Sequence, residues 1–118
     1  MSSWKTEAEE EIRLGLAERA EGMEGRARVR ARRAAGYVVG EYFRRRGVPD
    51  PGPNAYERLK LLLALPDVPA EAVEAARRLT MRVDMAFQLP AGVDLFTETQ
   101  RLAQVLLGEA FASLPLVE

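Results

Sequence analysis

Five arginines fall within eight positions in residues 26–33, at the start of the most basic segment of the sequence. At helical spacing Arg26, Arg30 and Arg33 share one face, and the other two arginines lie on the neighbouring face. Because the planar guanidinium pairs with phosphate through two hydrogen bonds, this pattern could bind phosphate groups. A second arginine run, residues 44–46, suits the negative end of the same helix.

A structural role is the preferred interpretation of these arginines. The sequence has a pI near 5.6, and no aromatic residue interleaves with residues 26–33 to stack on bases. Residues 1–25 carry a net charge of −4, residues 26–47 carry +7, and residues 48–118 carry −4. The acidic segment before residue 26 is therefore expected to pair with the arginines. Binding of a nucleotide or nucleic acid stays open but is not favoured.

A second group that could bind a phosphate or carboxylate consists of Arg78, Arg82 and Asp84. The two arginines lie one helical turn apart and are followed by a charged residue within an apolar stretch. Such a group near the groove of a helical bundle could hold an anion. The alternative is a set of structural ion pairs, of which Glu74 with Arg78 at i,i+4 is one expected member.

Four glutamates near the start of the sequence, Glu7, Glu9, Glu10 and Glu11, raise the question of a metal site. The di-iron bundle pattern needs Glu-x-x-His on paired helices, and the sequence has no His. No calcium-loop spacing is present either. We expect a solvated helix start there, with no metal and no cofactor.

The absence of both His and Cys excludes most familiar catalytic chemistry. It removes thiol nucleophiles, thiolate-bound zinc, disulfides and the Ser-His-Asp triad. The sequence shows no other catalytic set, so we expect a protein that is not an enzyme. The longest apolar run is too short to span a bilayer, and no signal peptide is visible, so a cytoplasmic location is expected. The excess of Arg over Lys and the single Asn fit a heat-adapted or GC-rich source.

The elements that would position these side chains are five helices in one domain, residues 1–118. They are expected at about residues 4–21, 26–46, 54–65, from 69 to the break at Pro90, and 95–111. Four of them are main helices of an all-α, up-and-down helical bundle, and the third is short. The predicted end signals are a capping box from Thr6 to Glu9, N-caps at Asn54 and Asp94, and a C-terminal Gly47.

Two glycines inside the second helix, Gly36 and Gly40, are costly there and predict close approach of another element. Trp4 is expected to be a core anchor or a contact between two copies. The tail around Leu114 and Leu116 is expected to lie against the body or to fray. Together these features predict a homodimer.

The order of these helices resembles that of the HEPN superfamily of small helical-bundle proteins. The small-residue-rich residues 31–39, the leucine-rich residues 54–65 and residues 79–90 with Arg82 and Pro90 are similar to the second, third and fourth helices of that family. Val83 and Asp84 replace the Tyr-Pro that often follows the arginine. Many HEPN proteins dimerise and pair with nucleotidyltransferases, or act as RNases through an Arg-x4–6-His motif.

Without His, that RNase motif cannot be completed here, so the resemblance implies an inactive or ligand-binding branch. The sequence therefore predicts a non-enzymatic, intracellular binding or adaptor protein that works as a homodimer or with a protein partner. The alternative is an HEPN-like factor associated with nucleotides or RNA, part of a toxin–antitoxin-type pair. Its phosphate-binding candidates are Arg26, Arg30, Arg33, Arg78 and Arg82, with Asp84 beside them.

Overall fold

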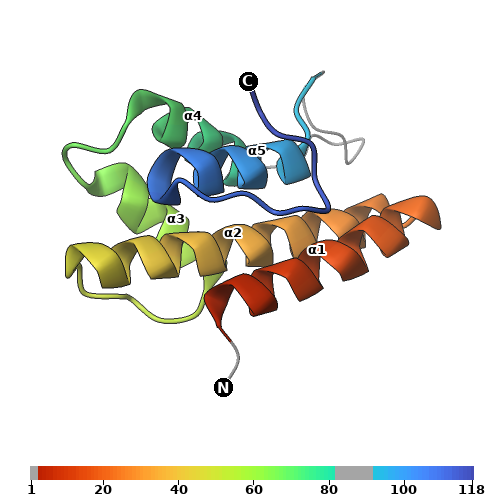
Figure 1. Ribbon diagram of the computed structural model, residues 1–118, viewed down its shortest axis with the longest axis horizontal. Coiled ribbons are helices and arrows are strands. Elements are labelled where there is room, and N and C mark those ends of the chain that lie inside the picture. Colours follow the sequence, from red (N-terminus) through yellow and green to blue (C-terminus); the bar gives the residue numbers. More distant parts are fainter. Residues whose placement is uncertain (1–2, 82–91) are drawn as a thin grey trace.

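Helix α2, Glu24–Arg46, is the element on which most of the other described helices pack (Figure 1). The computed structural model describes residues 3–81 and 92–118. Within these ranges the helices are α1 Trp4–Ala20, α2 Glu24–Arg46, α3 Ala55–Ala64, α4 Ala70–Leu79 and α5 Leu95–Leu102, which continues into a π-helix, η1 Ala103–Leu107. The described residues contain no strand, and the predicted all-α helical bundle is confirmed.

The main helices alternate in direction along the long axis of the molecule. α1 and α2 form an antiparallel hairpin, and α4 and α5 lie above α2 in the view of Figure 1. None of the helices in the described ranges has the length and apolar character needed to cross a bilayer.

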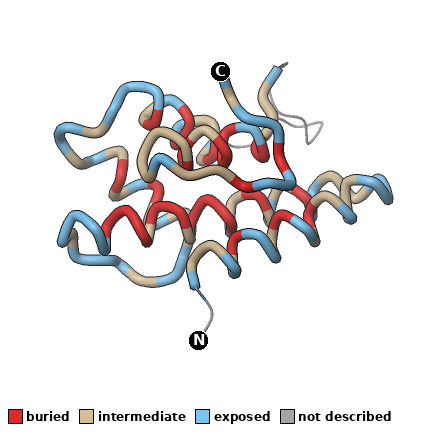
Figure 2. The backbone as a smooth tube through the Cα atoms, in the orientation of Figure 1, coloured by how far each residue is buried: buried red, intermediate tan, exposed pale blue. Residues whose placement is uncertain are grey.

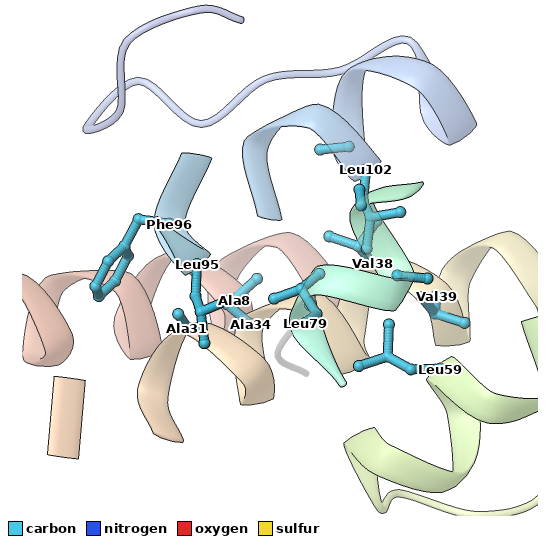
Figure 3. Packing of buried hydrophobic residues seen from close by; sticks show 14 of the residues in the cluster. Ala8, Ala31, Ala34, Val38, Val39, Leu59, Leu79, Leu95, Phe96 and Leu102 are labelled. Carbon is cyan, nitrogen blue, oxygen red and sulfur yellow. The ribbon is translucent and has the colours of Figure 1, made fainter. Parts of the chain in front are cut away.

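A stripe of small side chains makes α2 the centre of the core. Ala27, Ala31, Ala34 and Val38 are fully buried, and the buried part of α2 faces the other helices (Figures 2 and 3). The predicted close approach at Gly36 is confirmed, because a Cβ added there would lie only 2.8 Å from the Ala55 Cβ of α3. The small stripe therefore fixes which face of α2 is left for solvent.

Most of the predicted helix ends are correct. The side chain of Asn54 accepts a hydrogen bond from the Glu57 amide, Asp94 accepts one from the Phe96 amide, and Gly47 ends α2 with a φ of 66°. The capping box from Thr6 is wrong. Ser3 is the N-cap, and its hydroxyl accepts from the Thr6 amide, so the helix begins one turn earlier than that box implies.

Two helices are shorter than predicted. α4 ends at Leu79, where the Thr80 hydroxyl donates to carbonyls of the last turn. Residues 82–90, into which this helix is predicted to continue, lie outside the described residues. The last helix ends before Gly108, with a φ of 65°, instead of reaching Phe111. Residues 109–118 then turn back and run along α5 (Figure 1).

Candidate functional site

The side of α2 away from the alanine stripe carries the predicted arginine face. We call Arg26, Val29, Arg30, Arg33 and Tyr37 the basic face, since their spacing of three and four residues puts them on one side of the helix. Two neighbouring depressions share Arg33. One, of about 290 Å³, is lined by Glu18, Arg26, Val29, Arg30 and Arg33. The other, of about 280 Å³, is lined by Glu11, Arg33, Tyr37, Pro53 and Arg58.

Among the described residues, Arg30 is the member of the basic face that forms ion pairs with α1. Its Nε donates to Glu18 at 3.0 Å and its Nη1 donates to Glu11 at 3.2 Å. These two carboxylates raise the pKa of Arg30, Glu18 having the larger effect. The predicted pairing of the acidic first helix with the arginines is therefore confirmed at Arg30, which holds the hairpin together and has little capacity left for a ligand.

Arg26 and Arg33 differ from Arg30 because neither forms an ion pair with any residue that the structure describes. Arg26 donates only to the Met23 sulfur, at 3.6 Å, and Arg33 is exposed without a hydrogen bond to the described residues. Val29 lies between them and is 43% exposed, an unusual level for a large apolar side chain in this protein. Among the described residues, the basic face thus has two arginines without an ion pair on either side of an apolar side chain.

The depression beside Arg33 also contains donors that the arginine pattern did not predict. Arg58 is held rigidly, with bonds of 3.0 and 2.7 Å to the two Asp50 oxygens and one of 3.1 Å to the Gly36 carbonyl. Hydrogen bonding to Arg58 lowers the pKa of Asp50. Tyr37 is half-buried, and its hydroxyl forms no hydrogen bond with the described residues.

Sequence reasoning missed Tyr37 and Arg58 as members of this site. Tyr37 follows Arg33 by one helical turn, so the same periodicity that groups the arginines includes it. The signal for Arg58 is Gly40, where an added Cβ would lie 2.8 Å from the guanidinium carbon. A glycine in α2 predicts close contact with another element, but it does not identify the residue that makes the contact.

The second predicted group does not join the first. Arg78 lines a different depression, together with Ala70, Glu71, Glu74 and Arg101. It pairs at 3.3 Å with the buried Glu98, which also accepts from Arg101 at 3.1 Å. The predicted pair of Glu74 with Arg78 is wrong, because Glu74 pairs with Arg77 at 2.9 Å. Arg82 and Asp84 lie outside the described residues.

The glutamates of α1 serve mainly as partners of arginine. Glu10 bonds to Arg13 at 2.6 Å, and this hydrogen bond lowers the pKa of Glu10. Glu7, Glu9 and Glu10 also line an open depression of about 630 Å³ beside Ala112 and Ser113. No group of three or more acidic, His or Cys side chains suited to a metal ion occurs within residues 3–81 and 92–118.

Searches with known proteins found no matching family model, no matching curated protein and no matching solved structure. The resemblance to HEPN proteins therefore stays a prediction. Guanidinium and phenol donors around an apolar side chain, as on the basic face, are groups that can hold an anion by charge and hydrogen bonding.

Proposed function

We propose that this protein is a non-enzymatic, cytoplasmic binding module, an adaptor that holds an acidic segment of a partner protein against its basic face. Arg26 and Arg33 would pair with two carboxylates of the partner, and Val29 would contact an apolar side chain between them. A reducing compartment suits a chain without cysteine.

The single observation that carries this proposal is the pair of arginines without an ion-pair partner in the described residues, two helical turns apart on one face of α2. Seven residues of α-helix span about 10.5 Å, which matches two carboxylates at the same spacing on a helical segment of a partner. Asp50 already pairs with Arg58, and Glu11 and Glu18 pair with Arg30. The remaining positive charge is therefore in two separate places, as suits two separated carboxylates.

A second candidate is a factor associated with nucleotides or RNA, as the resemblance to HEPN proteins implies. One observation favours it. Tyr37 adds an aromatic ring to the depression that contains Arg33, and such rings can stack on bases. This candidate needs phosphate binding by the same arginines, so one experiment can separate the two.

The test uses a labelled helical peptide with two Glu seven residues apart and a Leu midway, together with the same peptide carrying Gln in place of Glu. We expect only the Glu peptide to bind, with an affinity that falls as salt is raised, because exposed charges are screened. Arg33→Glu should weaken binding by at least about tenfold, as expected when an attractive charge pair becomes repulsive.

The matched control is Arg13→Glu, which makes the same charge change on α1 at an exposed arginine paired with Glu10. This variant should bind the peptide as the unchanged protein does. Equal binding of the Glu and Gln peptides, or no effect of Arg33→Glu, would overturn the proposal. A short RNA or ATP that binds more tightly than the Glu peptide at equal salt would favour the second candidate instead.

A further inference from the structure

The side chains of Gln100 and Gln104 form a clamp on the main chain of residues 109–118. Gln100 Oε1 accepts from the Phe111 amide at 2.8 Å, and its Nε2 donates to the Phe111 and Leu114 carbonyls at 3.1 and 3.2 Å. One turn later, Gln104 bonds to both the amide and the carbonyl of Val117, at 2.8 and 2.9 Å. Each glutamine thus binds the main chain of residues 109–118, and Gln100 holds both ends of the turn that the Leu114 amide closes on the Phe111 carbonyl.

Apolar side chains at intervals of three residues anchor the same segment. Phe111 is 1% exposed and Leu114 is 9% exposed, and Val117 is half-buried. The Phe111 ring meets the edge of Trp4, with ring centroids 6.1 Å apart and planes at 70°. Glu109 adds ion pairs to Lys5 and Arg45, at 3.3 and 2.7 Å. Every one of these contacts joins residues 109–118 to α1, α2, α5 or η1.

The connection between η1 and this segment is a single sharp reversal at Gly108. Its φ of 65° is in the left-handed region, and a Cβ added to it would meet no atom within 4 Å among the described residues. The Gly108 and Glu109 amides donate to the Gln104 and Ala103 carbonyls at 3.1 and 3.2 Å, so the turn rests on two backbone hydrogen bonds and a left-handed residue. A hinge of this kind can extend without disturbing the groove that receives the segment.

We propose that the groove formed by Trp4, Gln100 and Gln104 also takes residues 109–118 of a second copy of this chain, which gives a dimer with reciprocally exchanged segments and Gly108 as the hinge. Complementarity is already present, because the segment of a second copy makes the same hydrogen bonds and apolar contacts. The tethered segment has an effective concentration in the millimolar range for a short connection, so exchange rises as the protein concentration approaches about 1 mM.

The test uses two variants with the same local strain at different places, Gly108→Val and Gly47→Val. Gly47 ends α2 with a φ of 66°, and a Cβ there also meets no described atom within 4 Å. Valine is strained at both positions, but only at Gly108 does extension of the hinge release a short segment. We expect the association constant for dimer formation, measured by sedimentation, to be at least about tenfold higher for Gly108→Val than for the unchanged protein. The strain of valine at residue 108 is relieved at both hinges of the dimer. Gly47→Val should dimerise no more strongly than the unchanged protein does.

Nuclear magnetic resonance identifies which segment is exchanged. In a mixture of ¹³C-labelled and unlabelled protein, filtered spectra should show contacts between Trp4 of one copy and Phe111 of the other, in the Gly108→Val dimer and in the unchanged protein near 1 mM. Trp4 is the single tryptophan, so its signals are unambiguous. Dimers without this contact, equal dimerisation of the two variants, or a monomer under all conditions would overturn the proposal.

Discussion

The two arginine runs of α2 are alike in composition but opposite in their surroundings. At one end, Arg26 and Arg33 point to solvent without an ion pair in the described part of the chain. At the other end, Arg44 and Arg45 converge on Glu41, whose side chain is 7% exposed, at 2.7 and 2.8 Å. Together with Lys5 and Glu109 they form what we call the Glu41 cluster.

A run of arginines is therefore a candidate binding surface only where its guanidinium groups are not already paired with carboxylates within the protein. In the Glu41 cluster each carboxylate accepts from two basic residues, which joins the start of α1, the end of α2 and residues after η1. On the basic face, by contrast, Arg26 and Arg33 form no ion pair with the described residues. We therefore expect substitutions in the Glu41 cluster to change stability, and those at Arg33 to change binding.

The largest expected effect is that of Glu41→Gln. The substitution removes the charge that accepts three guanidinium hydrogen bonds and leaves a buried amide with mismatched partners. The free energy of unfolding, measured with a chemical denaturant, should fall by about 1–3 kcal/mol. The control Glu10→Gln breaks an ion pair whose carboxylate is 53% exposed, and it should change stability very little. Equal losses in both variants would contradict the comparison.

Lowering the pH should remove the stability that the Glu41 cluster contributes. The hydrogen bond from Arg44, followed by that from Arg45, lowers the pKa of Glu41 from its ordinary value of 4.5 to about 2. Because the unfolded chain binds this proton at higher pH than the folded one, the contribution is complete above pH 4.5 and is lost as pH falls through 2. Unfolding curves at several pH values should show this loss, and Glu41→Gln should show a smaller one. Identical slopes would contradict it.

Arg30→Ala should have an intermediate effect, since Arg30 is the arginine of the basic face that is paired. Its loss leaves Glu11 and Glu18, whose side chains are only 17% and 16% exposed, without their shared partner. We expect a measurable loss of stability, smaller than that of Glu41→Gln because water reaches this site more easily. Thermal unfolding would measure it, and a loss as large as that of Glu41→Gln would mean that the hairpin depends on this one residue.

Local signals explain how much of this could be predicted from the sequence. Asn54, Asp94 and Gly47 act within one turn of their own backbone, so their roles as caps follow from residue type and position. The partner of Arg78 could not be predicted in the same way. It is Glu98 on another helix, and side-chain spacing within α4 favoured Glu74.

In the candidate site, too, the features that depend on one helix could be predicted and those that depend on contacts between elements could not. The grouping of Arg26, Arg30 and Arg33 follows from helical periodicity alone. Which of them would be left without an ion pair depends on how α1 packs on α2, because that packing brings both Glu11 and Glu18 to Arg30. Arg58 enters from another element and has no signature within α2 beyond Gly40.

The smallest expected effect on stability is that of Arg33→Ala. With no ion pair to the described residues, Arg33 contributes mainly repulsion with Arg26 and Arg30 on the same face. The free energy of unfolding should change by less than about 0.5 kcal/mol, and any change at low salt should be stabilising. Unfolding curves at low and high salt would show this, because screening removes the repulsion and with it the difference between the two proteins. A clear loss of stability at low salt would instead mean that Arg33 holds the fold together as Arg30 does, and the basic face would then resemble the Glu41 cluster.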